Sequence, residues 1–352
     1  MTKIASIDIG TNSVKLLVAR VDSRGVVHPL KEMAQTTRLG RGQGKTGRLD
    51  RAGVQKTIRV LKNYTRLAQK YGADKIIAAA TSAVRESKNK NSFLKKIFRE
   101  TALKVKVLTV RQEAFLAYRG VVSGCPVKER RTAPITCLTG RQASGPARLV
   151  IDIGGGSAEL VWGINDRPAG YKSLPLGAVK LTERFIRNDP VTQKEYDCLV
   201  LFIKKQITFA FSGGGAGSAA GLVRWMGKYR PSAKKINVIG AGGAAVTLAA
   251  LTSLFRYERA GLAQKSRPRA FFILSSKKLR LLINRLKKSD LAVRRRMLGR
   301  FADRADIILS GAAALQCLMQ ALNLKRIAIS PRGLRYGLIL LYLKKYFKKI
   351  FP

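Results

Sequence analysis

The chain has 352 residues, of which 46% are hydrophobic, so it can form a large core or two ordinary domains and is neither a disordered tail nor a fibrous repeat. It carries 68 Lys and Arg against 20 Asp and Glu, a formal net charge of +48 that favours anionic partners such as nucleic acid, anionic lipid or a phosphate-rich substrate. The single histidine, His28, excludes a His-rich metal site, and four scattered cysteines favour a reducing, cytoplasmic compartment over a disulfide framework.

The chain opens with a strand–turn–strand pattern that recurs near its middle. The first copy, Ile4–Arg20, reads IASIDIGTNSVKLLVAR, and the second, Leu149–Gly163, reads LVIDIGGGSAELVWG. Each copy has an apolar run, then Asp-Ile-Gly, a turn of small residues and a second apolar run, and glycine permits the tight backbone of the turn. Two copies predict duplicated domains that face each other across a cleft. Because no long apolar run precedes Asp8, we expect no signal peptide.

Helical and strand patterns alternate along the rest of the chain, which predicts layered α/β domains. Helices are predicted at Asp50–Gly72, Asn91–Leu103, Gln112–Val121, Lys180–Phe185, Thr192–Ala210, Gly240–Leu254, Asp306–Ala321 and from Leu334 onward. Strands are predicted at Lys75–Ala80, Val105–Thr109, Ile236–Ile239 and Arg326–Ile329, with a turn at Thr81–Arg85, a linker at Gly124–Arg148 and a Gly/Ser/Ala insertion at Ser212–Gly221. Polar residues and glycines interrupt the long uncharged stretches, so we expect core helices and no transmembrane segment.

Two segments are strongly basic. The predicted helical region Lys277–Arg304 has eleven Lys and Arg against Asp290 and Asp303, and it is either a solvated face or a surface that guides polyanions. The segment Leu338–Phe351 reads LILLYLKKYFKKIF; it either touches an anionic membrane or, as we expect, docks on the protein as a terminal helix.

Three glycine-rich turns follow apolar strands, at Ile7–Ser13, Ile151–Ser157 and Ile239–Ala245. In such turns the backbone N–H groups can point at a phosphate, and the missing Cβ lets the ligand approach. Asp8 and Asp152 directly precede the first two turns and would supply hard oxygen ligands for Mg²⁺. The alternative is that each aspartate only caps its own turn. Together the three turns favour a phosphate site.

In these and further segments the chain resembles the Ppx/GppA family of exopolyphosphatases and guanosine pentaphosphate phosphohydrolases. The segments occur in family order: Ile4–Arg20, TRLGRG at Thr37–Gly42, ATSAVRESKNKNSF at Ala80–Phe93, VLTVRQEAFLAYRGV at Val107–Val121, VIDIGGGSAEL at Val150–Leu160, LPLGAVKLTERF at Leu174–Phe185, GAGGAAVTLAAL at Gly240–Leu251, RADIILSGAAAL and ISPRGLRYG. The length is that of the family's short form. The resemblance therefore covers nearly the whole chain.

The resemblance implies an α/β fold of two ribonuclease H-like domains of the actin, sugar kinase and heat-shock chaperone ATPase superfamily, flanking a cleft. We expect an N-terminal domain at residues 1–123 and a C-terminal domain at 124–352, with a terminal helix at about 334–352 that packs back on the first domain. The implied activity is release of terminal orthophosphate from inorganic polyphosphate, guanosine pentaphosphate or both. A homodimer is common in the family, and nucleic acid is not required.

The resemblance also implies roles for individual residues. Glu113 falls where the family has its general base, and Arg85 where an arginine contacts phosphate. The phosphate-binding residues would be Gly10, Thr11, Asn12 and Ser13 of the first loop and Gly154, Gly155, Gly156 and Ser157 of the second. Mg²⁺, or another divalent cation, would bind near Asp8 and Asp152. For Glu159 we expect an exposed strand position rather than a supporting role in the site.

The chain departs from the family pattern at five positions. Val110, Gln112 and Phe115 stand where Gly, Glu and Arg are usual around the catalytic glutamate, Ala244 stands where Thr is common, and Tyr336 where Glu is common. These changes leave open a catalytically weak or inactive polyanion-binding protein with the same fold. A kinase of the same superfamily is a weaker alternative, because that class's acceptor-binding segments are not recognisable.

Overall fold

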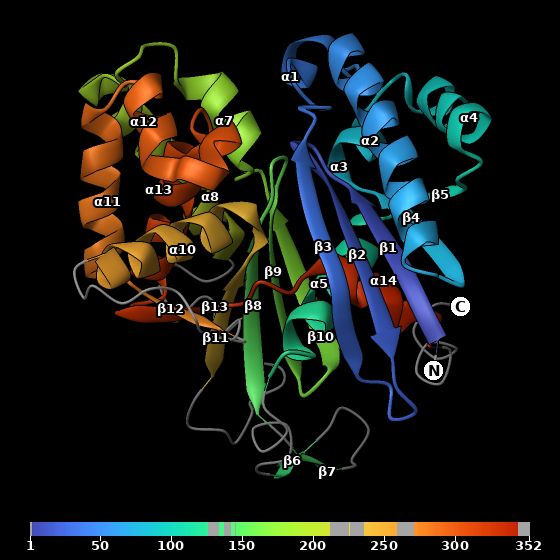
Figure 1. Cartoon of the computed structure of the whole chain (residues 1–352). Helices are drawn as coiled ribbons and strands as arrows, with labels where there is room; N and C mark the ends of the chain where they lie inside the picture. Colours follow the sequence, from blue (N-terminus) through green and yellow to red (C-terminus); the bar gives the residue numbers. More distant parts are fainter. Residues whose placement is uncertain are drawn as a thin grey trace. The chain divides into compact units, whose positions relative to one another are not determined.

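The computed structural model describes residues 2–125, 134–136, 142–144, 146–211, 225, 236–258 and 271–343 (Figure 1). The chain forms two compact units, Met1–Ser123 with Arg332–Pro352, and Gly124–Pro331. The predicted insertion at Ser212–Gly221, most of the predicted linker and the residues after Leu343 lie outside the described residues. Within the described part, no helix is long and apolar enough to cross a membrane.

The first unit is built on one five-stranded sheet. Its strands are β1 (Thr2–Ile9), β2 (Ser13–Val21), β3 (Val27–Thr36), β4 (Lys75–Ala80) and β5 (Val105–Val107), and its helices are α1 (Gln43–Thr46), α2 (Arg51–Lys70), α3 (Ser82–Glu86), α4 (Lys90–Thr101), α5 (Val110–Val122) and α14 (Leu334–Tyr342). The strand order is β3-β2-β1-β4-β5, in which β1, β2 and β3 pair antiparallel and β1, β4 and β5 pair parallel.

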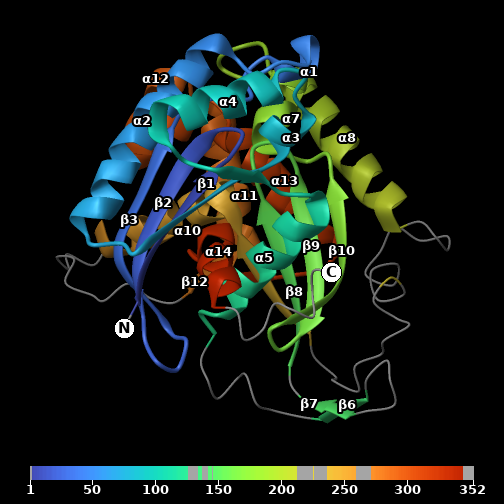
Figure 2. The same cartoon turned by 90° about the vertical axis from the view of Figure 1, so that its right-hand side faces the viewer.

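Alternation along β1 divides its side chains between two apolar layers. Ile7 and Ile9 belong to the core that α2 and α4 cover, whereas Ile4 packs with Ile339 of α14 on the other face. Asp8 lies four residues after Ile4 on the same strand, so its side chain points to the same face of the sheet, the one that α14 covers. Figure 2 shows α5 and α14 side by side in this unit. The sheet thus directs Asp8 to the side that α5 and α14 cover.

Glycines let α14 approach α5 closely. A Cβ at Gly120 of α5 would overlap the backbone oxygen of Gly333, and one at Gly337 of α14 would overlap the backbone oxygen of Leu116. Arg335, on α14, donates to the backbone oxygen of Leu16 at 2.9 Å, which ties the helix to β2. The C-terminal helix is therefore an integral part of the first unit and fixes the position of α5.

The second unit is built on a six-stranded sheet. Its strands are β8 (Ala147–Ile153), β9 (Ala158–Ile164), β10 (Arg167–Leu174), β11 (Asn237–Ala241), β12 (Phe272–Ser275) and β13 (Arg326–Ile329), and a separate pair is formed by β6 (Pro134–Thr136) and β7 (Gln142–Ser144). The helices are α7 (Ala178–Phe185), α8 (Gln193–Phe211), α10 (Gly242–Glu258), α11 (Ser276–Lys288), α12 (Leu291–Leu298), the 3-10 helix η2 (Gly299–Arg304) and α13 (Ile308–Ala321). The order is β10-β9-β8-β11-β13-β12.

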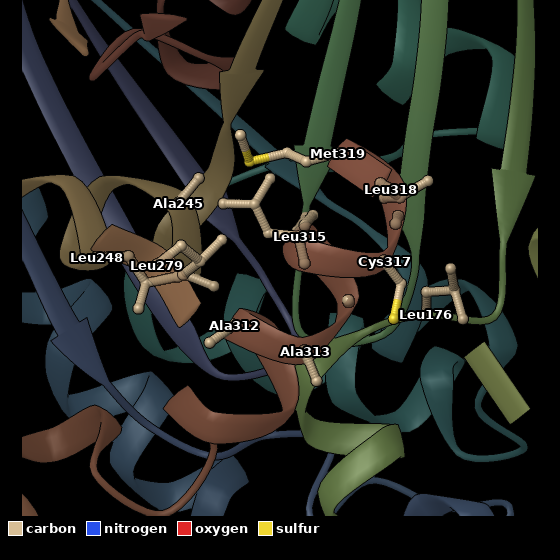
Figure 3. Close-up of a cluster of buried hydrophobic side chains, with 14 of the residues drawn as sticks. Leu176, Ala245, Leu248, Leu279, Ala312, Ala313, Leu315, Cys317, Leu318 and Met319 are labelled. Atoms are coloured by element: carbon tan, nitrogen blue, oxygen red, sulfur yellow. The ribbon is translucent and has the colours of Figure 1, made fainter. Parts of the chain in front are cut away.

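Helix α13 forms the centre of this unit's core. Every residue from Ile308 to Met319 is buried, which a helix permits only when other elements surround it. Figure 3 shows Leu315 and Met319 of α13 among side chains from α10 and α11, including Leu248 and Leu279. The predicted core helix at this segment is thus confirmed.

The two sheets share one topology. Leaving out the extra edge strand β12, each sheet has three antiparallel strands in sequence order, followed by two strands parallel to the first. The repeated sequence forms equivalent hairpins, since Asp8 pairs in register with Lys15 and Asp152 with Glu159. The predicted α/β fold with two ribonuclease H-like sheets is confirmed.

Candidate active site

The first glycine turn is held by backbone hydrogen bonds on several sides. The amide of Gly10 donates to the oxygen of Ser13 at 3.1 Å, which closes the turn between β1 and β2. The oxygen of Asn12 accepts from the amides of Thr37 and Arg38, each at 2.9 Å. The segment Thr37–Gly42 (TRLGRG) therefore packs against this loop through backbone hydrogen bonds. A loop fixed in this way can present its remaining N–H groups to an anion without further ordering.

The turn after β4 lies next to the same loop. The hydroxyl oxygens of Thr11 and Ser82 are 3.3 Å apart and both residues are buried. Thr81 donates its amide to the oxygen of Ile9, which anchors the start of α3 at the end of β1. The segment predicted as a turn is thus a short helix, α3, whose first residue reaches the phosphate-binding candidate loop.

Arg85 and Glu113 form an ion pair in the first unit. Nη1 of Arg85 donates to Oε2 of Glu113 at 2.7 Å and to the backbone oxygen of Leu108 at 2.9 Å. The side chains are 17% and 15% exposed, so water reaches both. Within the described residues, Nε and Nη2 of Arg85 make no protein hydrogen bond.

The position of Glu113 follows from how α5 begins. Thr109 accepts from the amide of Gln112, and the Gln112 side chain accepts from the amide of Thr109, which forms a complete capping box. Glu113 comes next, in the first turn, where the helix dipole favours a negative charge. The carboxylate is therefore fixed in position at a helix N-terminus.

Asp8 lies on the same face of the sheet as α5. Its register partner on β4, Ala79, packs with Leu116, which is one helical turn from Glu113. Asp8 is 5% exposed, and its Oδ2 lies 3.5 Å from Nζ of Lys15. The first unit thus brings Asp8, Arg85 and Glu113 to one side of the sheet, at the strand ends where the first loop begins.

The second glycine turn repeats the first within the second unit. The amide of Gly154 donates to the oxygen of Ser157 at 2.9 Å, as Gly10 does to Ser13. The oxygens of Gly154 and Gly155 accept from amides at the start of α7. A Cβ at Gly177 would overlap Gly155 and Gly156, so only glycine permits this close contact. The loop is therefore supported from behind by α7.

The third glycine turn packs against Asp152. Gly242 has a φ of +89°, and a Cβ there would lie 2.5 Å from Oδ1 of Asp152 and would overlap the oxygen of Ile153. The guanidinium of Arg304 occupies the space beside the next residue, Gly243. The sequence singled out all three glycine turns, but it gave no indication that Arg304 reaches one of them.

Glu159 is buried, which contradicts the expectation of an exposed strand position. Its side chain accepts from the hydroxyl of Ser157 at 2.6 Å and from that of Ser173 at 3.0 Å, and the residue is 4% exposed. Both faces of β9 are buried, so the alternation rule for a half-exposed strand does not apply. Glu159 holds the hydroxyl of the second loop in place.

A sequence profile of the Ppx/GppA phosphatase family matches residues 17–346. The chain belongs to this family. Among curated relatives, exopolyphosphatase 1 of Mycobacterium tuberculosis is 28% identical over 341 residues, which cover 96% of this chain and 87% of the relative. Exopolyphosphatase 2 of the same organism is 31% identical over 219 residues, 59% of this chain and 62% of that protein.

Solved structures of Ppx/GppA proteins have the same fold. The crystal structure of the Aquifex aeolicus family member has a TM-score of 0.68 and 28% identity, with 97% of each chain covered. An exopolyphosphatase from Cytophaga hutchinsonii has a TM-score of 0.78 at 22% identity, with 97% of this chain and 98% of that one covered. Each match covers 97% of this chain.

The departures from the Ppx/GppA pattern have structural roles in this chain. Val110 begins α5, Gln112 completes its capping box, and Phe115 is buried with the Arg111 guanidinium 5.3 Å from its ring centre. Ala244 lies where a Cβ on Gly311 would meet it at 2.6 Å, so the neighbouring helix leaves little room for a larger side chain. These four altered residues therefore fit their surroundings.

Proposed function

We propose that this chain is an exopolyphosphatase-type hydrolase that releases terminal orthophosphate from inorganic polyphosphate, guanosine pentaphosphate or both. The observation that carries the proposal is the Arg85–Glu113 pair, which places a carboxylate beside a cation with unused donors. Exopolyphosphatase 1 of Mycobacterium tuberculosis, which is aligned over nearly the whole chain, supports the same class of reaction.

In the first unit we assign separate roles to the two charged side chains. Glu113 acts as the general base, which takes a proton from the attacking water. Arg85 binds oxygens of the terminal phosphate through Nε and Nη2, while Nη1 keeps the Glu113 carboxylate in position. Gly10, Thr11, Asn12 and Ser13 provide the turn that receives phosphate oxygens.

In the second unit the corresponding turn has the same role. The turn of Gly154, Gly155, Gly156 and Ser157 receives phosphate oxygens through the backbone N–H groups that the turn itself does not use. Because Ser157 donates its proton to Glu159, its hydroxyl oxygen has a fixed orientation toward that carboxylate. Glu159 is thus a positioning residue in this proposal.

The residues present fit a divalent cation that is shared with the substrate. Within the described residues no group of three His, Cys, Asp or Glu side chains could hold a metal alone. Mg²⁺, however, is commonly held by one or two carboxylates together with water and substrate phosphates. Asp8 and Asp152 each offer one carboxylate at a strand end, next to a glycine turn. Bound Mg²⁺ would neutralise negative charge on the phosphate chain.

The test is the product pattern on polyphosphate of defined length with Mg²⁺ present. We expect orthophosphate to appear from the start, with substrate chains that shorten from their ends, and we expect chelation of the metal to stop the release. Wild-type protein that is inert on polyphosphate and on guanosine pentaphosphate would refute the enzymatic assignment and leave a polyanion-binding protein. Products of intermediate length would indicate internal cleavage. They would refute cleavage from the chain end but not the hydrolase assignment.

A further inference from the structure

Three consecutive helices of the second unit carry a dense group of exposed cations. We call it the basic surface; it consists of the exposed side chains Lys277, Lys278, Arg280, Arg285, Lys288, Arg295, Arg296 and Arg300 on α11, α12 and η2. Only two acidic residues, Asp290 and Asp303, occur between Lys277 and Arg304. Asp290 accepts from the amide of Val293 at 2.7 Å and so caps α12.

The helices that display these cations are firmly anchored. Helix α11 buries Leu279, Leu282 and Leu286 on its inner face and is capped by Ser275. Helix α12 is pinned by the buried Arg294, which donates to the carboxylate of Asp189. The outward cations are therefore presented on a fixed framework, and α11 spans ~16 Å between its first and last lysines at 1.5 Å per residue.

Most of these cations have no acidic partner. Within the described residues, Lys277, Lys278, Arg280, Lys288, Arg295 and Arg296 take part in no ion pair. On α2 of the first unit one cation, Lys62, does have an acidic partner, Glu100. Like charges three or four residues apart on a helix repel one another, so a bound polyanion would relieve this repulsion.

The chain segment that carries the basic surface ends beside the glycine turn that borders Asp152. Arg300 and Arg304 both lie on η2, and the guanidinium of Arg304 contacts Gly243 in the third glycine turn. The preceding residue, Gly242, contacts Asp152. The last cation of this stretch, Arg304, therefore lies at the turn that borders Asp152.

The surface suits phosphate groups without bases. Proteins that bind single-stranded nucleic acid combine cations with aromatic side chains on which bases stack. From Lys277 to Arg304 the sequence has one aromatic residue, Phe301, which is half-buried with the Arg300 guanidinium 4.9 Å from its ring centre. To bind an unbranched chain of phosphates, a protein needs only positive charge and hydrogen-bond donors.

We propose that the basic surface binds the non-reacting part of a long inorganic polyphosphate chain while its end is hydrolysed. The inference rests on the proposed function and adds to it a binding surface outside the glycine turns. It predicts a preference for long chains over tripolyphosphate, because a short substrate cannot reach both the turns and α11.

The experiment compares two variants with equal loss of charge. One carries Lys278→Gln, Arg280→Gln, Lys288→Gln and Arg296→Gln on the basic surface. The control carries Lys56→Gln, Arg59→Gln, Arg66→Gln and Lys70→Gln on the exposed side of α2 in the first unit. Binding of fluorescent long-chain polyphosphate is measured over a range of salt concentrations without Mg²⁺, and kcat/KM is measured on long chains and on tripolyphosphate.

We expect the basic-surface variant to bind long chains about tenfold more weakly, with a slope of log K against log salt reduced by about 2 to 3. Its ratio of kcat/KM on long chains to that on tripolyphosphate should fall about tenfold, and the control should keep the wild-type ratio. Equal effects in both variants, or none in either, would overturn the inference.

Two further outcomes concern the identity of the bound polyanion and its coupling to hydrolysis. If single-stranded DNA of equal charge binds the wild type more tightly than polyphosphate and loses affinity in the basic-surface variant, the surface serves nucleic acid and the inference is wrong. If the wild type binds polyphosphate through this surface but releases no phosphate, the proposed function has failed. In that case binding to the surface is shown and its coupling to hydrolysis is refuted.

Discussion

Nη1 of Arg85 donates at once to the carboxylate of Glu113 and to the backbone oxygen of Leu108. This arrangement joins α3, the end of β5 and the first turn of α5 through one nitrogen atom. Nε and Nη2 of the guanidinium make no hydrogen bond to the described residues. In the proposed function they bind phosphate oxygens, while Nη1 orients the candidate base.

Replacing Arg85 with lysine should separate these two roles. Lysine keeps the charge and can contact Glu113, but it lacks the planar fork for phosphate oxygens. Loss of one charge-assisted hydrogen bond, about 1.5–3 kcal/mol, predicts that kcat/KM for polyphosphate falls about 10- to 100-fold. Steady-state kinetics check this, and an unchanged kcat/KM would exclude Arg85 as a phosphate contact.

The third glycine turn gives a prediction on stability. Gly242→Ala combines a left-handed backbone with overlap at Ile153 and Asp152, so we expect a loss of about 3–5 kcal/mol in the free energy of unfolding. The matched control is Gly299→Ala, where φ is +49° but no atom lies within 4 Å of an added Cβ. It should cost less, about 1–3 kcal/mol, because only the backbone strain at a ψ of −117° opposes it. Urea denaturation measures both, and equal losses would show that the turn does not pack closely on Asp152.

The departure at Tyr336 can be tested together with its partner. The hydroxyl of Tyr336 donates to the carboxylate of Glu32, and burial followed by that carboxylate raises the pKa of Tyr336, so it stays protonated. Tyr336→Glu, which restores the residue common in the family, would place two carboxylates together. We expect it to cost about 2–4 kcal/mol of stability, and Tyr336→Phe about 1–2 kcal/mol.

A double-mutant cycle identifies the cause of that cost. In a Glu32→Gln background the carboxylate repulsion is absent, so Tyr336→Glu should be at least about 1 kcal/mol less destabilising than in the wild type. Chemical denaturation of the four proteins gives the coupling. A coupling of zero would mean that Tyr336 fills space without interacting with Glu32.

Acid stability should depend on Glu195. Burial opposes ionisation of this side chain, but hydrogen bonds from Thr192, Arg187 and Asn188 outweigh it and lower its pKa to about 2. Because the pKa is lower in the folded protein, its stabilising effect is present above the ordinary value of 4.5 and is lost as pH falls toward about 2.

Thermal denaturation of the wild type and Glu195→Gln measures this effect. The wild type should melt at a higher temperature at pH 6, and the difference should shrink steadily between about pH 4.5 and 2. Asp197→Asn, which removes a neighbouring carboxylate that accepts from Gln193, should give a smaller difference at pH 6. If the difference in melting temperature between the wild type and Glu195→Gln stayed constant over this pH range, the lowered pKa of Glu195 would be contradicted.

The sequence was sufficient to predict elements with clear periodicity or a repeat. Helix α2 and strand β4 were expected within a residue or two of their observed ends, and the hairpins around Asp8 and Asp152 were expected from their shared pattern. Strand β3 was not predicted, because Pro29 and alternating charged residues hide an edge strand that faces water. Strand β10 was missed for a similar reason, since its burial pattern is irregular.

The candidate site was predictable only as a set of residues. Motif order singled out Arg85 and Glu113, but it could not show that they form an ion pair, because that contact depends on how α3 and α5 pack. Burial of Glu159 was likewise hidden, since a glutamate in a strand is usually exposed. The division of the chain into domains and the metal role of Asp8 and Asp152 stay predictions.

The role of Glu113 is the central claim, and the most direct measurement is phosphate release by the wild type and Glu113→Gln on long polyphosphate, tripolyphosphate and guanosine pentaphosphate with Mg²⁺. Glutamine can still accept from Arg85, so the variant should fold and bind polyphosphate like the wild type. We expect its kcat to fall by about 10²- to 10⁴-fold on every substrate that the wild type cleaves. A folded variant with wild-type kcat would contradict the account.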